Sequence, residues 1–72
     1  MVAMPRIEAA TLAEHHELVL GRILDAFGAE MSAAGFTDLT LAMVAKRAGI
    51  ARATIYNYFS DKFEVLLAYV ER

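Results

Sequence analysis

The chain has 72 residues, 58% of them hydrophobic, no cysteine and a formal net charge of −2. A chain of this length forms one small domain with a thin core, and the lack of cysteine excludes disulfides and thiolate metal sites. No apolar run is long enough to span a membrane, and the first residues do not form a signal peptide, so we expect a cytoplasmic protein.

The charges are unevenly distributed along the chain. Residues 1–40 hold two basic and six acidic side chains, whereas residues 41–72 hold five basic and three acidic ones. Between Leu41 and Lys62 the only acid is Asp61. Because the local field governs docking on a polyanion, the negative total does not exclude a nucleic-acid partner.

A long amphipathic helix is expected to end at Gly35, since glycine often follows a helix C-terminus. Two starts remain open. Thr11 has a glutamate three residues later, as in a capping box, while Pro5 suits a first helical position. Residues 1–10 are therefore a tail or an extension of this helix, and residues 11–72 form the domain. The apolar stripe comprises Val19, Leu20, Ile23, Leu24, Phe27 and Met31.

Two short helices joined by a glycine turn are expected next. Thr40 is the expected N-cap of the first, and Gly49 ends it in a left-handed turn. Ile50 is expected to plug the core, and the second helix to cover about 51–59. The stripe of the first short helix comprises Leu41, Val44, Ala45 and Ala48.

A fourth helix follows, capped by Ser60 or by Asp61, which has a glutamate three residues later. Phe63, Leu66, Leu67 and Val70 continue its helical spacing. The apolar end at Leu66, Leu67 and Val70 is expected to lie partly bare. No segment alternates like a strand. The sequence therefore predicts an all-α fold: a small helical bundle with a helix-turn-helix, namely a homeodomain-like three-helix core and the start of a fourth helix.

The second short helix has a polar and aromatic outer face when it is drawn on a helical wheel. Ile55, Tyr58 and Phe59 fall together and are expected to face the core. The opposite face carries a guanidinium, a methyl group, a phenol and an amide, from Arg52, Ala53, Tyr56 and Asn57. Arginine and asparagine form hydrogen bonds with the edges of guanine and adenine in the major groove, so this face predicts sequence-specific DNA binding.

Side chains at the edges of this face suit contacts with phosphate. Thr54, Tyr58 and Lys62 carry hydroxyls and an ammonium that can meet phosphate oxygens. Each feature also has a structural alternative. Tyr56 and Tyr58 can be packing aromatics, and Lys62 can cap or pair with a neighbouring acid. For Lys46 two interpretations are open: its ammonium contacts a DNA phosphate, or it simply lies on a solvent-exposed face of its helix.

Many spaced positions match the pattern of one family. They are Gly35, Phe36, Thr40, Val44, Ala45, Ala48, Gly49, Ile50, Ala53, Thr54, Ile55, Tyr56, Tyr58, Phe59 and Lys62. Together with the Ile-Leu-Asp-Ala run at 23–26, they resemble the N-terminal DNA-binding domain of TetR-family transcriptional regulators. The resemblance covers about residues 20–70.

The resemblance implies that the helix at 51–59 enters the major groove of double-stranded DNA. Arg52 and Ala53 then match positions that face bases. The positions that contact the DNA backbone are Thr54, Tyr56, Tyr58 and Lys62, and we add Thr40, Lys46 and Asn57 to the expected DNA-binding residues. Two departures remove polar groups: Ala51 stands where the family often has serine, and Leu-Ala-Met at 41–43 replaces polar residues.

The resemblance also implies what the rest of such a protein does. The family carries a C-terminal domain for ligand binding and dimerisation, which is absent from these residues. We therefore expect a ligand-responsive repressor that forms a homodimer on a palindromic operator and answers to a small-molecule inducer bound in that domain.

Two other classes of function were weighed. One is a helical protein-interaction module whose basic face binds an acidic partner. The other is an enzyme, but no histidine, cysteine or serine lies in a plausible catalytic constellation, so none is expected. His15 and His16 are adjacent and point about 100° apart on a helix, which makes a shared metal ligand set awkward. We expect no metal and no cofactor.

Overall fold

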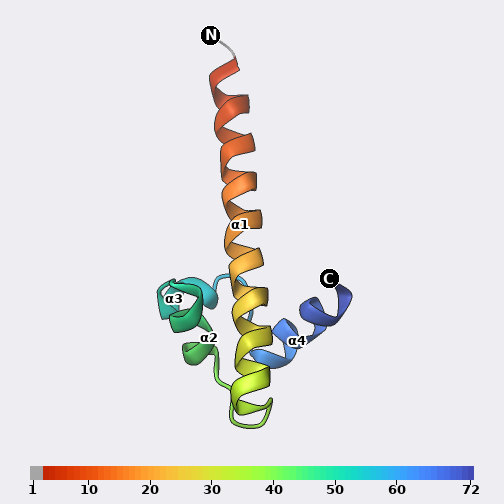
Figure 1. Ribbon diagram of the computed structural model, residues 1–72. Coiled ribbons are helices and arrows are strands. Elements are labelled where there is room, and N and C mark those ends of the chain that lie inside the picture. The colour runs from red at the N-terminus through yellow and green to blue at the C-terminus, as the bar shows by residue number, and fades with distance from the viewer. Residues whose placement is uncertain (1–2) are drawn as a thin grey trace.

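The computed structural model describes the backbone of residues 3–72 and the side chains of residues 12–72. Within them the chain forms four helices and no strand, which confirms the predicted all-α fold. The helices are α1 (Ala3–Ala34), α2 (Leu41–Ala48), α3 (Arg52–Ile55) and α4 (Lys62–Glu71). The helices α2 and α3 lie on one side of the C-terminal half of α1, and α4 lies on the other side (Figure 1). No helix in the described part is long and apolar enough to cross a membrane.

The first helix starts earlier than a cap at Thr11 would place it. It runs without a break from Ala3, so of the two starts left open the one near Pro5 is confirmed, and Thr11 lies inside α1. The single proline is in the first turn, where it is tolerated, and no residue between it and Ala34 forces a stop. Gly35 ends α1 as predicted. It has a φ of 83°, and its N–H donates to the Met31 carbonyl at 3.0 Å.

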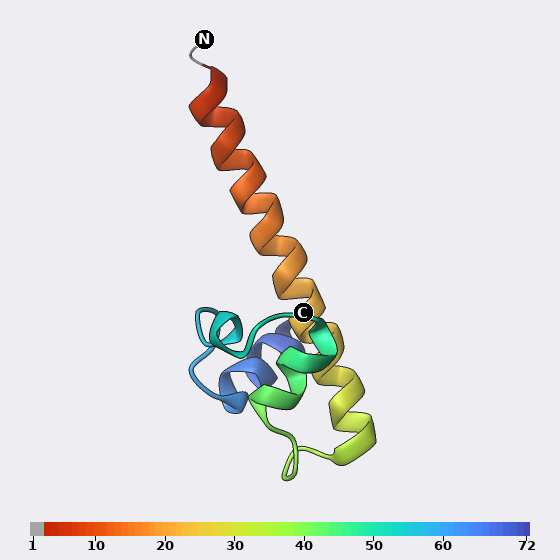
Figure 2. The same ribbon diagram turned by 90° about the vertical axis from the view of Figure 1, so that its left-hand side faces the viewer.

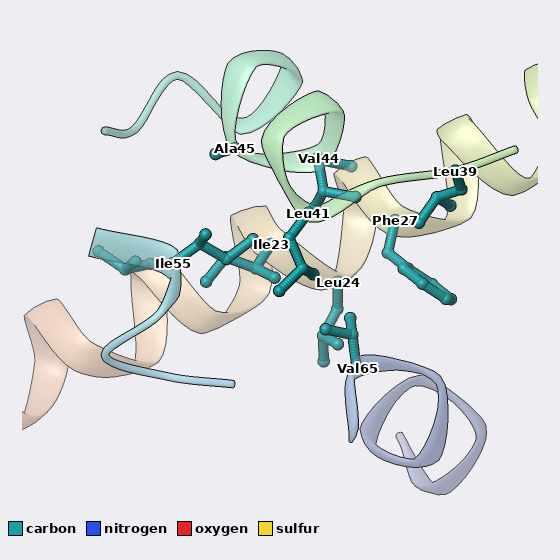
Figure 3. Packing of buried hydrophobic residues seen from close by; sticks show 11 residues of the cluster. Ile23, Leu24, Phe27, Leu39, Leu41, Val44, Ala45, Ile55 and Val65 are labelled. Carbon is teal, nitrogen blue, oxygen red and sulfur yellow. The ribbon is translucent and has the colours of Figure 1, made fainter. Parts of the chain in front are cut away.

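The hydrophobic core surrounds one stripe of α1. Side chains of α2, α3 and α4 converge on this stripe from three directions (Figure 3). Ile50 and Phe59 are partly buried and pack against the cluster, as expected. The buried apolar residues are Val19, Ile23, Leu24, Ala26, Phe27, Leu39, Leu41, Val44, Ala45, Ile55 and Val65.

The apolar residues of α4 divide between the core and the surface. Val65 is its fully buried residue, whereas Phe63, Leu67 and Val70 are 60%, 65% and 72% exposed. Leu66 is partly buried against the core, so the expected exposure of the apolar end is confirmed at Leu67 and Val70. Apolar residues cover most of the circumference of α4, so their spacing alone does not select the side that packs.

A close contact between Tyr69 and Gly28 sets how α4 packs on α1. A Cβ atom at Gly28 would lie 2.8 Å from the Tyr69 hydroxyl, so a larger residue would displace the ring. The ring also lies 5.6 Å from the ring of Phe27, measured between centroids. Of the two helical glycines, Gly28 thus allows a close approach, while a Cβ at Gly21 would meet nothing within 4 Å.

The ends of α2 follow the predicted chemistry. The Thr40 hydroxyl oxygen accepts a hydrogen bond from the Met43 N–H at 3.2 Å. At the other end, Gly49 has a φ of 76° and donates to the Lys46 carbonyl at 3.2 Å, while Ile50 donates to the Ala45 carbonyl at 3.0 Å. This pair of bonds is a Schellman motif, which satisfies carbonyls that a helix end leaves free.

The start of α4 is capped by Asp61, one of the two predicted candidates. Its carboxylate accepts from the Glu64 N–H at 3.0 Å. The Glu64 carboxylate in turn accepts from the Ser60 N–H at 2.6 Å, one residue before the cap. The two side chains thus bind backbone donors in both directions, as a capping box does.

Alanine at two glycine positions should have opposite effects on stability. Gly49→Ala forces a side chain into the left-handed region and should lower the free energy of unfolding by about 1–2 kcal/mol. Gly21→Ala adds a methyl group to open space inside α1 and should raise it by about 0.5–1 kcal/mol. Urea denaturation of the two variants and the parent measures both values. Equal effects would show that the turn conformation at Gly49 carries no strain.

Candidate nucleic-acid interface

The outer face of the α3 segment is polar, aromatic and exposed. Ile55 is fully buried, while Tyr56 on the other side is 48% exposed. Arg52, Ala53 and Asn57 are exposed as well. The division into a core side and an outer side is therefore the one that the helical wheel predicts. One buried side chain holds the segment while four outward side chains remain open to a partner.

The α3 helix is shorter than the predicted span of about 51–59. It covers Arg52–Ile55, and the chain continues as a tight turn in which Asn57 donates to Thr54 and Tyr58 donates to Ile55, each at 3.0 Å. Ala51 offers no side-chain cap, and β-branched and aromatic residues have modest helix propensity. The outer face is thus carried by one helical turn and the turn that follows it, residues 52–58.

Two of the other expected contact residues of the helix-turn-helix unit (residues 40–61) lie at or in α2, and two lie within this segment. Figure 2 shows α2 and α3 next to each other on the side that faces the viewer. Thr40 and Lys46 are exposed. The Thr40 oxygen accepts one bond from the backbone, which leaves its O–H as a donor. Thr54 and Tyr58 are half-buried, and Tyr58 packs against the core, so the packing role considered for it is present.

Lys62 occupies a different environment from the other expected contact residues. Its ammonium donates to three carbonyl oxygens of the loop between α1 and α2. The structural alternative for Lys62 was to cap or to pair with a neighbouring acid. Among the described side chains it forms no ion pair with an acid, but it does bind backbone carbonyls, as a capping side chain does. A phosphate contact by Lys62 would have to replace at least one of these carbonyls.

A stacked pair links α1 to the outer segment. The rings of His16 and Tyr58 lie 4.7 Å apart between centroids, with an interplanar angle of 28°. Sequence reasoning missed this contact, although a signal was present. His16 precedes Val19 by three residues and Ile23 by seven, so it lies on the core stripe of α1. The face of α1 that packs against the other helices thus extends beyond the apolar core to His16, whose ring supports the ring of Tyr58.

The charge of the helix-turn-helix unit is positive at its surface. Within the described side chains, ion pairs join Arg47 to Glu30 at 2.6 Å and Arg72 to Asp25 at 2.8 Å. Lys46 and Arg52 have no such pair, and the unit contains no acid before its last residue. A polyanion would therefore meet two uncompensated cations here.

The two histidines do not take part in a metal site within the described side chains. No group of three or more histidine, cysteine, aspartate or glutamate residues lies close enough there to hold a metal ion.

Comparison with known proteins gives a family match over most of the chain. The sequence profile of bacterial regulatory proteins of the tetR family matches residues 23–69. This range includes the core stripe of α1 from Ile23 onward, the helix-turn-helix unit and most of α4. No solved structure gives a significant match.

Two curated relatives are named as transcriptional regulators and a third as a nucleoid occlusion factor, and the chain covers only part of each. It is 35% identical over 65 residues to the HTH-type transcriptional regulator SrpR of Pseudomonas putida, covering 90% of this chain and 29% of that protein. The same identity and length relate it to the uncharacterized HTH-type transcriptional regulator TtgW of Pseudomonas putida, of which it covers 46%. It is 32% identical over 73 residues to the nucleoid occlusion factor SlmA of Haemophilus influenzae, covering 97% of this chain and 32% of that protein.

The stack of His16 on Tyr58 is open to a test with a matched control. His16→Ala removes the stack and should lower the free energy of unfolding by about 0.5–1 kcal/mol, the low end for aromatic pairs because His16 is exposed. His15→Ala makes the same change one position away, where the side chain points about 100° from the stack, and should have no comparable effect. Urea denaturation compares the two. Equal changes in the two variants would show that the stack does not contribute to stability.

Proposed function

The chain belongs to the TetR family of bacterial regulatory proteins, and from this premise we propose that it binds double-stranded DNA in a sequence-specific way. In this proposal the α3 segment, residues 52–58, enters the major groove. The observation that carries the proposal is the exposed face of Arg52, Tyr56 and Asn57 opposite the buried Ile55. A helix that only packs against the core does not need exposed polar and aromatic side chains on its outer side, whereas a helix that binds in the DNA major groove does.

Each outward side chain has a proposed role that follows from its chemistry. The Arg52 guanidinium suits the O6 and N7 acceptors of guanine, and the Asn57 amide suits N6 and N7 of adenine. Ala53 is small and exposed, so the backbone can approach the base edges closely. The proposed contacts to the DNA backbone come from Thr40, Lys46, Thr54, Tyr56 and Tyr58.

The proposed biological role is that of a transcriptional repressor. The chain spans less than half the length of the relatives described above. In our proposal, ligand control and dimerisation belong to a longer protein that contains these residues. We propose that such a protein binds a palindromic operator as a homodimer and is released by a small-molecule inducer. It would act in the cytoplasm, where bacterial DNA is found.

Arg52 and Lys46 should behave differently if one reads a base and the other a phosphate. Duplexes selected from a randomised library identify the preferred site, and fluorescence anisotropy then measures affinity across salt concentrations. Arg52→Ala should cost about 1–3 kcal/mol and relax preference at one base position. Lys46→Ala should weaken all duplexes alike and reduce the salt slope by about one unit.

Two results would contradict these assignments. Equal losses on every duplex for Arg52→Ala would show that Arg52 contacts only phosphate. Failure to select any duplex, together with salt-dependent binding to an acidic protein, would favour the helical interaction module over the DNA reader.

A monomer of this chain should bind DNA weakly. One short recognition segment with few phosphate contacts should give a dissociation constant near the nonspecific range, about 10⁻⁴ to 10⁻⁶ M at physiological salt. Fusion to a neutral dimeric coiled coil makes the second docking step intramolecular and should tighten binding to a palindrome by about a hundredfold or more. Titration of both forms, with sedimentation to establish the oligomeric state, makes the comparison. Nanomolar binding by the unfused monomer would overturn the dependence on a dimer.

A further inference from the structure

The ammonium of Lys62 uses all of its hydrogen-bond donors inside the protein. It donates to the carbonyl oxygens of Phe36 at 2.6 Å, Thr37 at 3.1 Å and Leu39 at 3.0 Å. It also lies 4.6 Å from the centroid of the Phe36 ring. An ammonium has three N–H donors, so this arrangement leaves none for an outside acceptor.

The three carbonyls belong to the loop that leads into the helix-turn-helix unit. Leu39 is fully buried, and the next residue, Thr40, is the N-cap of α2. Lys62 is the first residue of α4, directly after the unit ends. One side chain therefore ties together the two points where the chain enters and leaves residues 40–61.

The segment between these two points has little local stability of its own. The α3 helix has four residues and no side-chain cap, and α2 has eight residues. Helices this short depend on tertiary contacts for their position. Fixing both ends of the unit reduces the conformations open to it, as closing a loop does.

We propose that Lys62 is a positioning residue for DNA binding: its ammonium holds the two ends of the helix-turn-helix unit together instead of neutralising a phosphate. This inference rests on the proposed function and deepens it, because it assigns one expected contact residue to preorganisation. Removing the ammonium then loosens the loop at 36–39 and weakens DNA binding without removing a phosphate contact.

The first test needs no DNA. In the free protein, Lys62→Met keeps the aliphatic stem but removes the donors and the charge, and it should speed exchange of the Leu39 and Val44 amides. Those amides donate to Gly35 and Thr40 at 3.1 Å, on either side of the loop end. Lys46→Met is the matched control, since Lys46 is exposed on α2, and it should leave both amides unchanged. Unchanged exchange in Lys62→Met overturns the proposal.

The second test uses the salt dependence of DNA binding. Lys62→Met should weaken binding on the order of tenfold, as the loss of charge-assisted hydrogen bonds does, with an unchanged salt slope. Lys46→Met should lower the slope by about 0.9, the value for one phosphate contact. Lys62→Arg keeps the positive charge, but its planar guanidinium cannot donate to the three loop carbonyls from a single nitrogen, so it should not restore affinity. A slope lowered by one unit in Lys62→Met, or full rescue by arginine, overturns the proposal.

A third measurement uses the unmodified chain and so does not depend on a variant that folds. The ¹H–¹⁵N signal of the Lys62 ammonium should exchange slowly with water and stay unchanged when duplex DNA is added, unlike that of Lys46. A Lys62 signal that exchanges as fast as that of Lys46 overturns the proposal. If the unmodified chain binds no duplex, the proposed function fails, and the exchange measurements alone decide whether Lys62 orders the unit.

Discussion

The position of the α3 segment depends on the burial of one side chain, Ile55. The segment has four helical residues and no side-chain cap, so its own hydrogen bonds cannot keep it folded. Ile55 is fully buried and points toward Ile23 of α1 in the core (Figure 3). Since the outward residues lie opposite this anchor, the core sets the direction in which they point. The rest of the helix-turn-helix unit brings Ile55 to that place.

Local chemistry made much of the fold predictable from the sequence. Gly35, Thr40, Gly49 and Asp61 each act at a helix end through backbone bonds a few residues away, and all four positions were predicted. The start of α1 stayed open between Thr11 and the residues near Pro5, because a threonine with cap spacing can also lie inside a helix when nothing stops the chain. Val65, the buried residue of α4, was not singled out, since a helix that is apolar on most sides offers several stripes to the core.

In the proposed site, too, features that depend on nearby residues were predictable, while contacts between distant residues were not. The outer face at residues 52–58 follows from the position of Ile55 on a helical wheel, so its members could be predicted. The contacts of Lys62 with loop carbonyls and of His16 with Tyr58 join residues more than twenty positions apart. No spacing rule connects such residues. The helix-turn-helix unit is therefore recognisable from sequence, while the contacts that order it require the three-dimensional structure.

Whether the surface built on Ile55 is the surface that meets DNA can be decided by an NMR titration of the ¹⁵N-labelled chain with its selected duplex. The largest amide shift changes should occur at residues 52–58 and around Thr40, while the exposed apolar side of α4 should stay unchanged. Shift changes concentrated at Phe63, Leu67 and Val70, with residues 52–58 unaffected, would contradict this expectation.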